Sequence, residues 1–177
     1  MSGKSSRSKG QRGEREVCKL LQPIMDKVTA PYARYFEHLP RAARNLDQTR
    51  DGGHDIAGLP FLALEVKRCE TVQLNKWWNQ AVKQAKGGRI PVLLWRQSRK
   101  PWRCRMWATL ETSGRYKSKD KLTDAIECVA DIELDAFLLW FEEMFREHIK
   151  RVVFETWEEV KDQCADDFEF SLDPSNE

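Results

Sequence analysis

The stretch GGHDIAGLPFLALEVKR, residues 52–68, carries one aspartate, one glutamate and one lysine within short apolar segments. The residues at 58–60 are typical of a turn. The segments on either side, 55–58 and 61–67, have the composition of short strands. The stretch therefore predicts a β-hairpin that carries three charged side chains.

In such a hairpin Asp55 and Glu65 lie close together. A loop centred on Pro60 places them directly opposite each other, with Cβ atoms about 4.5–5.5 Å apart, whereas a loop centred on Leu59 makes them diagonal neighbours at about 7–8 Å. Lys67 follows Glu65 by two positions and therefore shares its face of the strand.

Two carboxylates beside a lysine favour a metal site that hydrolyses phosphodiester bonds. Mg²⁺ takes one or two protein carboxylates together with phosphate oxygens, and a bound ion of this kind polarises the phosphate. A lysine offsets the negative charge that develops in the reaction. The alternative is a structural ion pair, or charges that face solvent on a half-exposed hairpin.

The pattern of Asp55, nine residues, Glu65 and Lys67 resembles the PD-(D/E)xK nuclease superfamily. Within it the chain is most similar to archaeal-type Holliday junction resolvases and related phage endonucleases, because residues 10–15 read GQRGER and fit their G-x-x-x-E-R start. The chain departs from the superfamily at His54, where proline is usual. The resemblance implies a DNA endonuclease that uses Mg²⁺ or Mn²⁺, with branched DNA as a candidate substrate.

The resemblance also implies further site residues. Glu14 would be a third acidic group at the metal, beside Asp55 and Glu65. Gln80 or Gln84 would correspond to a polar residue that supports the site, and Gln48 could line the pocket. In this interpretation Lys67 stabilises charge and orients water.

The expected fold is an α/β, restriction-endonuclease-like core with an added C-terminal helical region. The implied order is a helix, a three-stranded antiparallel meander, a helix and a strand. We expect a flexible basic arm at 1–9, the nuclease core at 10–110, a loop and C-terminal helices at 111–164, and an acidic tail at 165–177. The loop would be the polar, Lys-rich part of the third segment, up to residue 123.

The charges divide the chain into two halves. Residues 1–105 carry 22 Lys and Arg against 9 Asp and Glu, whereas residues 106–177 carry 8 against 19. A basic half of this size is typical of a surface that meets phosphates, although accidental asymmetry of a solvated surface is the alternative. The candidate DNA contacts are Arg15, Arg44, Arg50, Arg68, Lys76, Arg96, Arg99 and Arg103.

The aromatic residues admit two interpretations. Trp77 and Trp78 are adjacent on a predicted helix, so at most one is expected to face the core well, and the other could stack on a base or pack on a partner. A second helix, predicted at 133–153, carries a broad apolar stripe that fits a core or a dimer seam. We expect a homodimer, since a symmetric pair would place two active sites on two DNA strands.

Composition limits the remaining classes. The 177 residues are 41% apolar and 33% charged, and no run of about 18 apolar residues predicts a membrane span. The N-terminus lacks the apolar region of a secretory signal, so we expect an intracellular protein, in the host cytoplasm if the source is viral. Five cysteines without zinc spacing predict reduced, apolar residues. The rival function is a DNA-binding or assembly protein that keeps the nuclease fold without catalysis.

Overall fold

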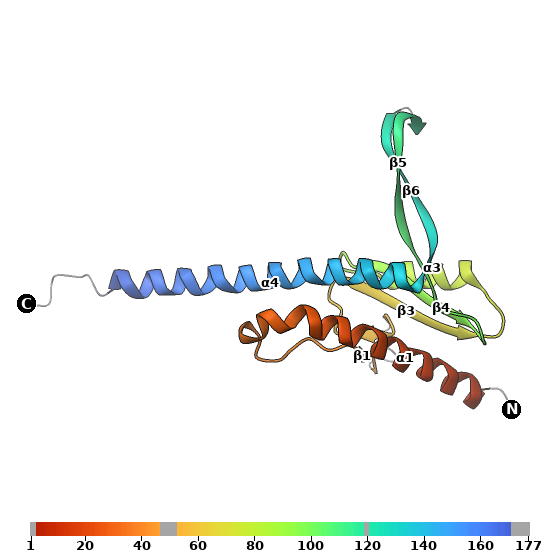
Figure 1. Cartoon of the computed structure of the whole chain (residues 1–177), viewed down its shortest axis with the longest axis horizontal. Coiled ribbons are helices and arrows are strands. Elements are labelled where there is room, and N and C mark those ends of the chain that lie inside the picture. Colours follow the sequence, from red (N-terminus) through yellow and green to blue (C-terminus); the bar gives the residue numbers. More distant parts are fainter. Residues whose placement is uncertain (1–2, 47–52, 119–120, 171–177) are drawn as a thin grey trace, which may run out of the picture.

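A four-stranded mixed sheet organises the chain (Figure 1). The computed structural model describes residues 3–46, 53–118 and 121–170, with side chains for 8–46, 53–111 and 125–155. The strands lie in the order β3 (Leu62–Cys69), β4 (Ile90–Gln97), β5 (Arg103–Ser118) and β6 (Lys121–Glu133). β3 and β4 are parallel, whereas β4, β5 and β6 are antiparallel.

Helix α3 (Leu74–Gln84) explains the parallel pair. Parallel strands need a crossover connection, usually a helix, and α3 is the crossover between β3 and β4. Gly87 and Gly88 both adopt positive φ angles and turn the chain from α3 into β4. The continuous apolar run of β4 suits a strand that is covered on both faces.

The two faces of the sheet carry separate cores. Helix α1 (Gly3–Thr29) and helix α4 (Leu134–Phe170) pack against one face, where Leu64 of β3 is fully buried. Helix α3 covers the other face, where its tryptophans surround Leu93 of β4. Because side chains alternate along a strand, Glu65 and Lys67 belong to the α3 face.

Trp77 and Trp78 are both buried, so the expectation that only one would face the core was wrong. The ring of Trp78 packs edge to face on Trp107 of β5, with centroids 5.7 Å apart. The contact with Trp107 covers the tryptophan that was expected to point away from the core. Neither tryptophan of α3 is therefore free to stack on a base.

The predicted antiparallel meander is wrong in its pairing. β1 (Ala43–Arg44) and β2 (Ile56–Ala57) form a separate two-stranded sheet, and a 3₁₀ helix, η1 (Ala30–Tyr35), precedes them. β3 instead pairs with β4 along its whole length. The mixed α/β class of the prediction holds, because both faces of β3 are covered by helices.

The two ends of the chain also differ from the prediction. α1 begins at Gly3, where a flexible arm was expected over residues 1–9. The two expected C-terminal pieces form one helix, α4, which continues to Phe170 and so includes the first part of the predicted acidic tail. Residues 171–177 lie outside the described residues.

The polar segment expected to be a loop forms a long hairpin. β5 and β6 pair from Arg103 with Glu133 to Ser118 with Lys121, with an irregularity between Glu111 and Tyr116. We call residues 107–118 and 121–129 the hairpin arm, because β4 does not extend beside them and they project from the body of the molecule (Figure 1). Lysine-rich composition hid this strand pairing.

The described part of the chain shows neither a membrane-type helix nor a disulfide. None of its helices combines the length and the apolar character needed to cross a bilayer. Cys18, Cys69, Cys104 and Cys128 are free thiols. Burial raises the pKa of Cys104 far above its usual value, so this thiol behaves as a small apolar residue, as predicted.

Candidate active site

Asp55 lies alongside the middle of β3. Its backbone N–H donates to the carbonyl of Leu64, 2.9 Å away, and its Oδ2 accepts from the N–H of Val66 at 2.7 Å. The carbonyl of Asp55 accepts from the N–H of Asn45 at 2.8 Å. These contacts hold Asp55 beside Glu65, the residue between Leu64 and Val66, as the hairpin interpretation required.

Glu65 and Lys67 meet on the α3 face of β3. The Lys67 ammonium group donates to Glu65 Oε1, which makes an ion pair between residues two apart on the strand. The Glu65 side chain is fully buried, whereas 26% of the Lys67 side chain is exposed. Glu65 therefore sits at the inner end of the site and Lys67 at its solvent side.

The second oxygen of Glu65 has no hydrogen-bond partner among the described residues. A buried carboxylate oxygen without a donor is costly unless a proton or a cation compensates it. This orphaned oxygen, next to Asp55, is an observation that fits a divalent cation.

The pKa of Glu65 reflects this crowding. Burial first, and then the Asp55 carboxylate, raise the pKa of Glu65 to about 7, while Lys67 opposes the rise and Glu14 adds to it. The charges of Asp55, Glu14 and Lys67 thus all reach Glu65. The structure brings the four predicted charged residues into one electrostatic neighbourhood.

The raised pKa of Glu65 makes stability depend on pH. Between pH 4.5, the ordinary value, and about 7, the folded protein keeps a proton that the unfolded chain has lost. The free energy of unfolding therefore falls as the pH rises through this interval.

Glu65→Gln is expected to stabilise the metal-free protein by about 1–2 kcal/mol at about pH 8, because relief of a buried charge outweighs the lost hydrogen bond with Lys67. At about pH 5, where Glu65 is already protonated, the gain should vanish. Urea denaturation in a chelator measures this, with the exposed Glu143→Gln on α4 as the control. An equal loss of stability at both pH values would contradict it.

Glu14 reaches the site from α1 but is already paired. Its Oε2 accepts from Arg44 Nε of β1, and the pair is mostly buried. Gly13, the preceding residue, lets α1 approach β3 closely, since a Cβ there would lie 3.3 Å from the Cβ of Arg68. Within the described residues, no group of three histidine, cysteine or acidic side chains is close enough to hold a metal by itself.

Two of the three glutamines predicted to support the site lie on α3. Gln80 is half-buried on α3, and no hydrogen bond joins it to an acidic side chain among the described residues. Gln84 Oε1 is buried without a hydrogen-bond partner in the same part of the chain. Gln48 lies outside the described residues.

Several candidate DNA contacts are occupied by carboxylates. Glu16 of α1 accepts from both Arg68 and Arg96, and Glu133 accepts from Arg103. Arg44 is held by Glu14 as described above, and Arg50 lies outside the described residues. Sequence reasoning missed Glu16, because its two arginines are 52 and 80 residues away.

The remaining candidates are exposed. Arg15 lies on α1, Lys76 on the first turn of α3, and Arg99 in the turn between β4 and β5. Arg99 adopts φ +64°, a left-handed conformation that few non-glycine residues take. No carboxylate of the described chain pairs with these three side chains.

A family comparison covers most of the chain. Residues 5–160 match the model of a family described as phage putative PDDEXK endonuclease. The chain belongs to this family. The predicted membership of the PD-(D/E)xK superfamily is thereby confirmed, and the family match continues through β5 and β6 into α4.

The PDDEXK endonuclease family gives the broad class of the protein, a nuclease type whose members typically use divalent metal ions. Neither the curated proteins nor the solved structures gave a match.

Proposed function

We propose that the chain is a metal-dependent DNA endonuclease whose catalytic residues are Asp55, Glu65, Lys67 and Glu14. The observation that carries the proposal is the buried Oε2 of Glu65, beside Asp55 and Lys67, which has no hydrogen-bond partner in the described part of the chain. A purely structural ion pair would not need a second carboxylate that raises the cost of the first. A site that binds a cation needs both carboxylates, because each supplies oxygen ligands.

Asp55 and Glu65 would hold Mg²⁺ or Mn²⁺, and Glu14 would join them as a third ligand only by leaving Arg44 and moving closer. The ion would supply polarisation of the phosphodiester and activation of a water nucleophile. Lys67, at the solvent side of Glu65, would face the incoming phosphate and balance its charge. Gln80, on the helix that covers this face of the sheet, would support the site.

Arg44 gives Glu14 its place in this proposal. Arg44 pairs with Glu14 and neutralises its charge. If Glu14 bound a metal ion instead, the freed guanidinium of Arg44 could donate two hydrogen bonds to a phosphate. Arg15, Lys76 and Arg99 would contact phosphates directly, whereas Arg68, Arg96 and Arg103 would first have to leave their carboxylates. Arg50 is proposed from the sequence alone.

One assay tests the function and its rival together. A labelled four-way junction and a matched linear duplex are incubated with Mg²⁺, with Mn²⁺ and with a chelator. Metal-dependent cleavage supports the nuclease, and preference for the junction supports a Holliday junction resolvase. Binding without cleavage of duplex, flap, single-stranded or four-way DNA supports the alternative, a non-catalytic DNA-binding or assembly protein.

We also propose that the protein is a homodimer, although the stripe predicted as a seam cannot serve. Phe137, Phe141 and Phe145 of that stripe are buried in the chain's own core. The hairpin arm offers a better surface. Its register sets Ala108 opposite Cys128 and Leu110 opposite Ile126, two apolar pairs on one face near the base of the arm.

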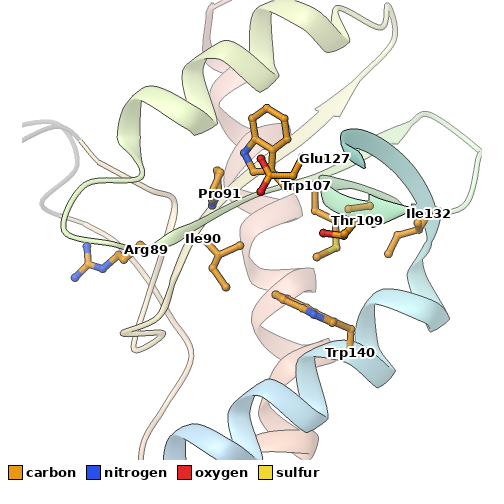
Figure 2. A pocket seen from close by; sticks show the side chains of 10 residues that line it. Arg89, Ile90, Pro91, Trp107, Thr109, Glu127, Ile132 and Trp140 are labelled. Carbon is orange, nitrogen blue, oxygen red and sulfur yellow. The ribbon is translucent and has the colours of Figure 1, made fainter. Parts of the chain in front are cut away.

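This face continues into a cavity of about 750 Å³ at the base of the arm. Figure 2 shows Trp140 of α4 on one side of it, with Ile90 at the start of β4 and Trp107 of β5 nearby. None of the lining residues belongs to the acidic cluster, so the cavity is not the candidate active site. A two-stranded ribbon is only marginally stable in water by itself.

A second copy would cover the arm with the same apolar face, as a two-fold interface requires. Leu110 is 57% exposed, and Leu110→Lys is expected to convert a dimer to a monomer in sedimentation equilibrium. Leu139→Lys on the outer side of α4, where the leucine is 70% exposed, is the matched control. A monomeric wild-type protein at concentrations of about 50 μM would remove the proposal.

A further inference from the structure

Helix α1 presents a row of basic side chains to solvent. Arg12, Arg15 and Lys19 are exposed and follow one another at steps of three and four residues, which places them on one helical face. Val17 and Leu21 of the same helix are fully buried, so the row lies on the side away from the core.

These charges are available, unlike most others in the basic half. Arg68, Arg96, Arg103 and Arg105 each pair with a carboxylate. Among the residues that the structure describes, no acidic side chain pairs with Arg12, Arg15 or Lys19. Repulsion within a row of unpaired cations destabilises the folded protein, whereas a bound polyanion would be attracted to the same row.

The row shares the first part of α1 with Glu14 but lies on a different face of the helix, because neighbouring helical residues point about 100° apart. Glu14 lies between Arg12 and Arg15 in the sequence, and its side chain meets Arg44 of β1. Further along the helix, a hollow between α1 and the β1 segment is lined by Lys19 and by the exposed Arg41. Lys19 and Arg41 thus extend the basic surface from α1 toward β1, beside Asp26, which lines the same hollow.

We propose that α1 is the rail along which the nucleic acid strand lies, with Arg12, Arg15, Lys19 and Arg41 binding consecutive phosphates. This rests on the proposed nuclease function and assigns its substrate a binding surface on the outer face of α1. From Arg12 to Lys19 the helix rises by about 10 Å. One DNA strand carries about three phosphate charges over that length, which matches the three side chains.

Salt-dependent binding tests the rail. A variant with Arg12→Gln, Arg15→Gln and Lys19→Gln is titrated against a labelled duplex in a chelator, so that cleavage cannot interfere. The slope of log K against log salt concentration should fall by about 2–3, since each lost phosphate contact removes about 0.9. Affinity near physiological salt should drop by about tenfold or more.

Two companion variants separate charge from folding. Arg12→Lys with Arg15→Lys keeps the charges and should keep the slope. Lys83→Gln, Lys86→Gln and Arg89→Gln remove three exposed charges near the end of α3, on the other side of the sheet, and should leave the slope within about one half of the wild-type value. Matching melting temperatures verify that every variant is folded.

The outcomes distinguish this inference from the nuclease proposal. An unchanged slope in a folded rail variant overturns the rail, even if the wild-type protein cleaves DNA. A reduced slope supports the rail, even if no substrate is cut and the catalytic proposal fails. Absence of DNA binding by the wild-type protein also overturns the rail. So does a rail variant in which only the oligomeric state changes, because the row would then bind a protein partner.

Discussion

Lys67→Ala is expected to reduce metal-dependent DNA cleavage by about 100- to 1,000-fold, the usual effect of removing one group that stabilises charge in a transition state. The ammonium group of Lys67 is the exposed member of the pair with buried Glu65. Its loss removes the positive charge at the solvent side of the site and raises the pKa of Glu65 further. Single-turnover cleavage of the preferred substrate measures the effect.

DNA affinity in a chelator should change by less than about threefold in Lys67→Ala, because one phosphate contact among several is lost. Lys86→Ala, an exposed lysine outside the site, is the control and should keep full activity. Asp55→Asn should likewise cut slowly while it still binds DNA. Cleavage by Lys67→Ala at the wild-type rate would show that this ammonium group has no part in the reaction.

Gly58→Ala is expected to destabilise the fold by at least about 3 kcal/mol. Gly58 has φ +83°, and a Cβ added there would lie 1.9 Å from the carbonyl oxygen of Arg41. The neighbouring atom belongs to the backbone, so no side-chain rotation can relieve the collision. The β1–β2 pair must separate, and Asp55, one residue before β2, would leave its place beside Glu65.

Gly87→Ala is the matched control for Gly58→Ala. Gly87 also has a positive φ, +68°, but nothing lies within 4 Å of an added Cβ. It should lose only about 1 kcal/mol, the cost of a left-handed backbone for alanine. Urea denaturation of both variants therefore isolates the steric contribution, and equal losses would show that Gly58 is required for its backbone angle alone.

The shared face of Glu65 and Lys67 was predictable from the sequence because a strand has a period of two. Glu65 and Lys67 had to share a face, with Leu64 turned to the opposite side, whatever the strand paired with. The short connection from Asp55 to β3 brought the second carboxylate near in either hairpin register. Superfamily membership follows from the same residues and from the start of the first helix.

Pairing between distant segments was not predictable in the same way. β3 has two edges, and local composition does not show that β4 pairs in parallel with one of them along its whole length while Asp55 bonds to the other. The parallel choice depends on α3, which has to cover Glu65 and bury two adjacent tryptophans. The strands of the hairpin arm were hidden because their polar, lysine-rich stretch has the composition of a loop.

From the sequence alone follow the residue types on β3 and the basic character of the first half of the chain. Which of those charges are paired with carboxylates depends on the tertiary structure. Glu16 and Glu133 neutralise arginines far away in the sequence, while the outer row of α1 keeps its charge. The physical reason is that electrostatic energy depends on distance in space and on burial, and the folded chain sets both.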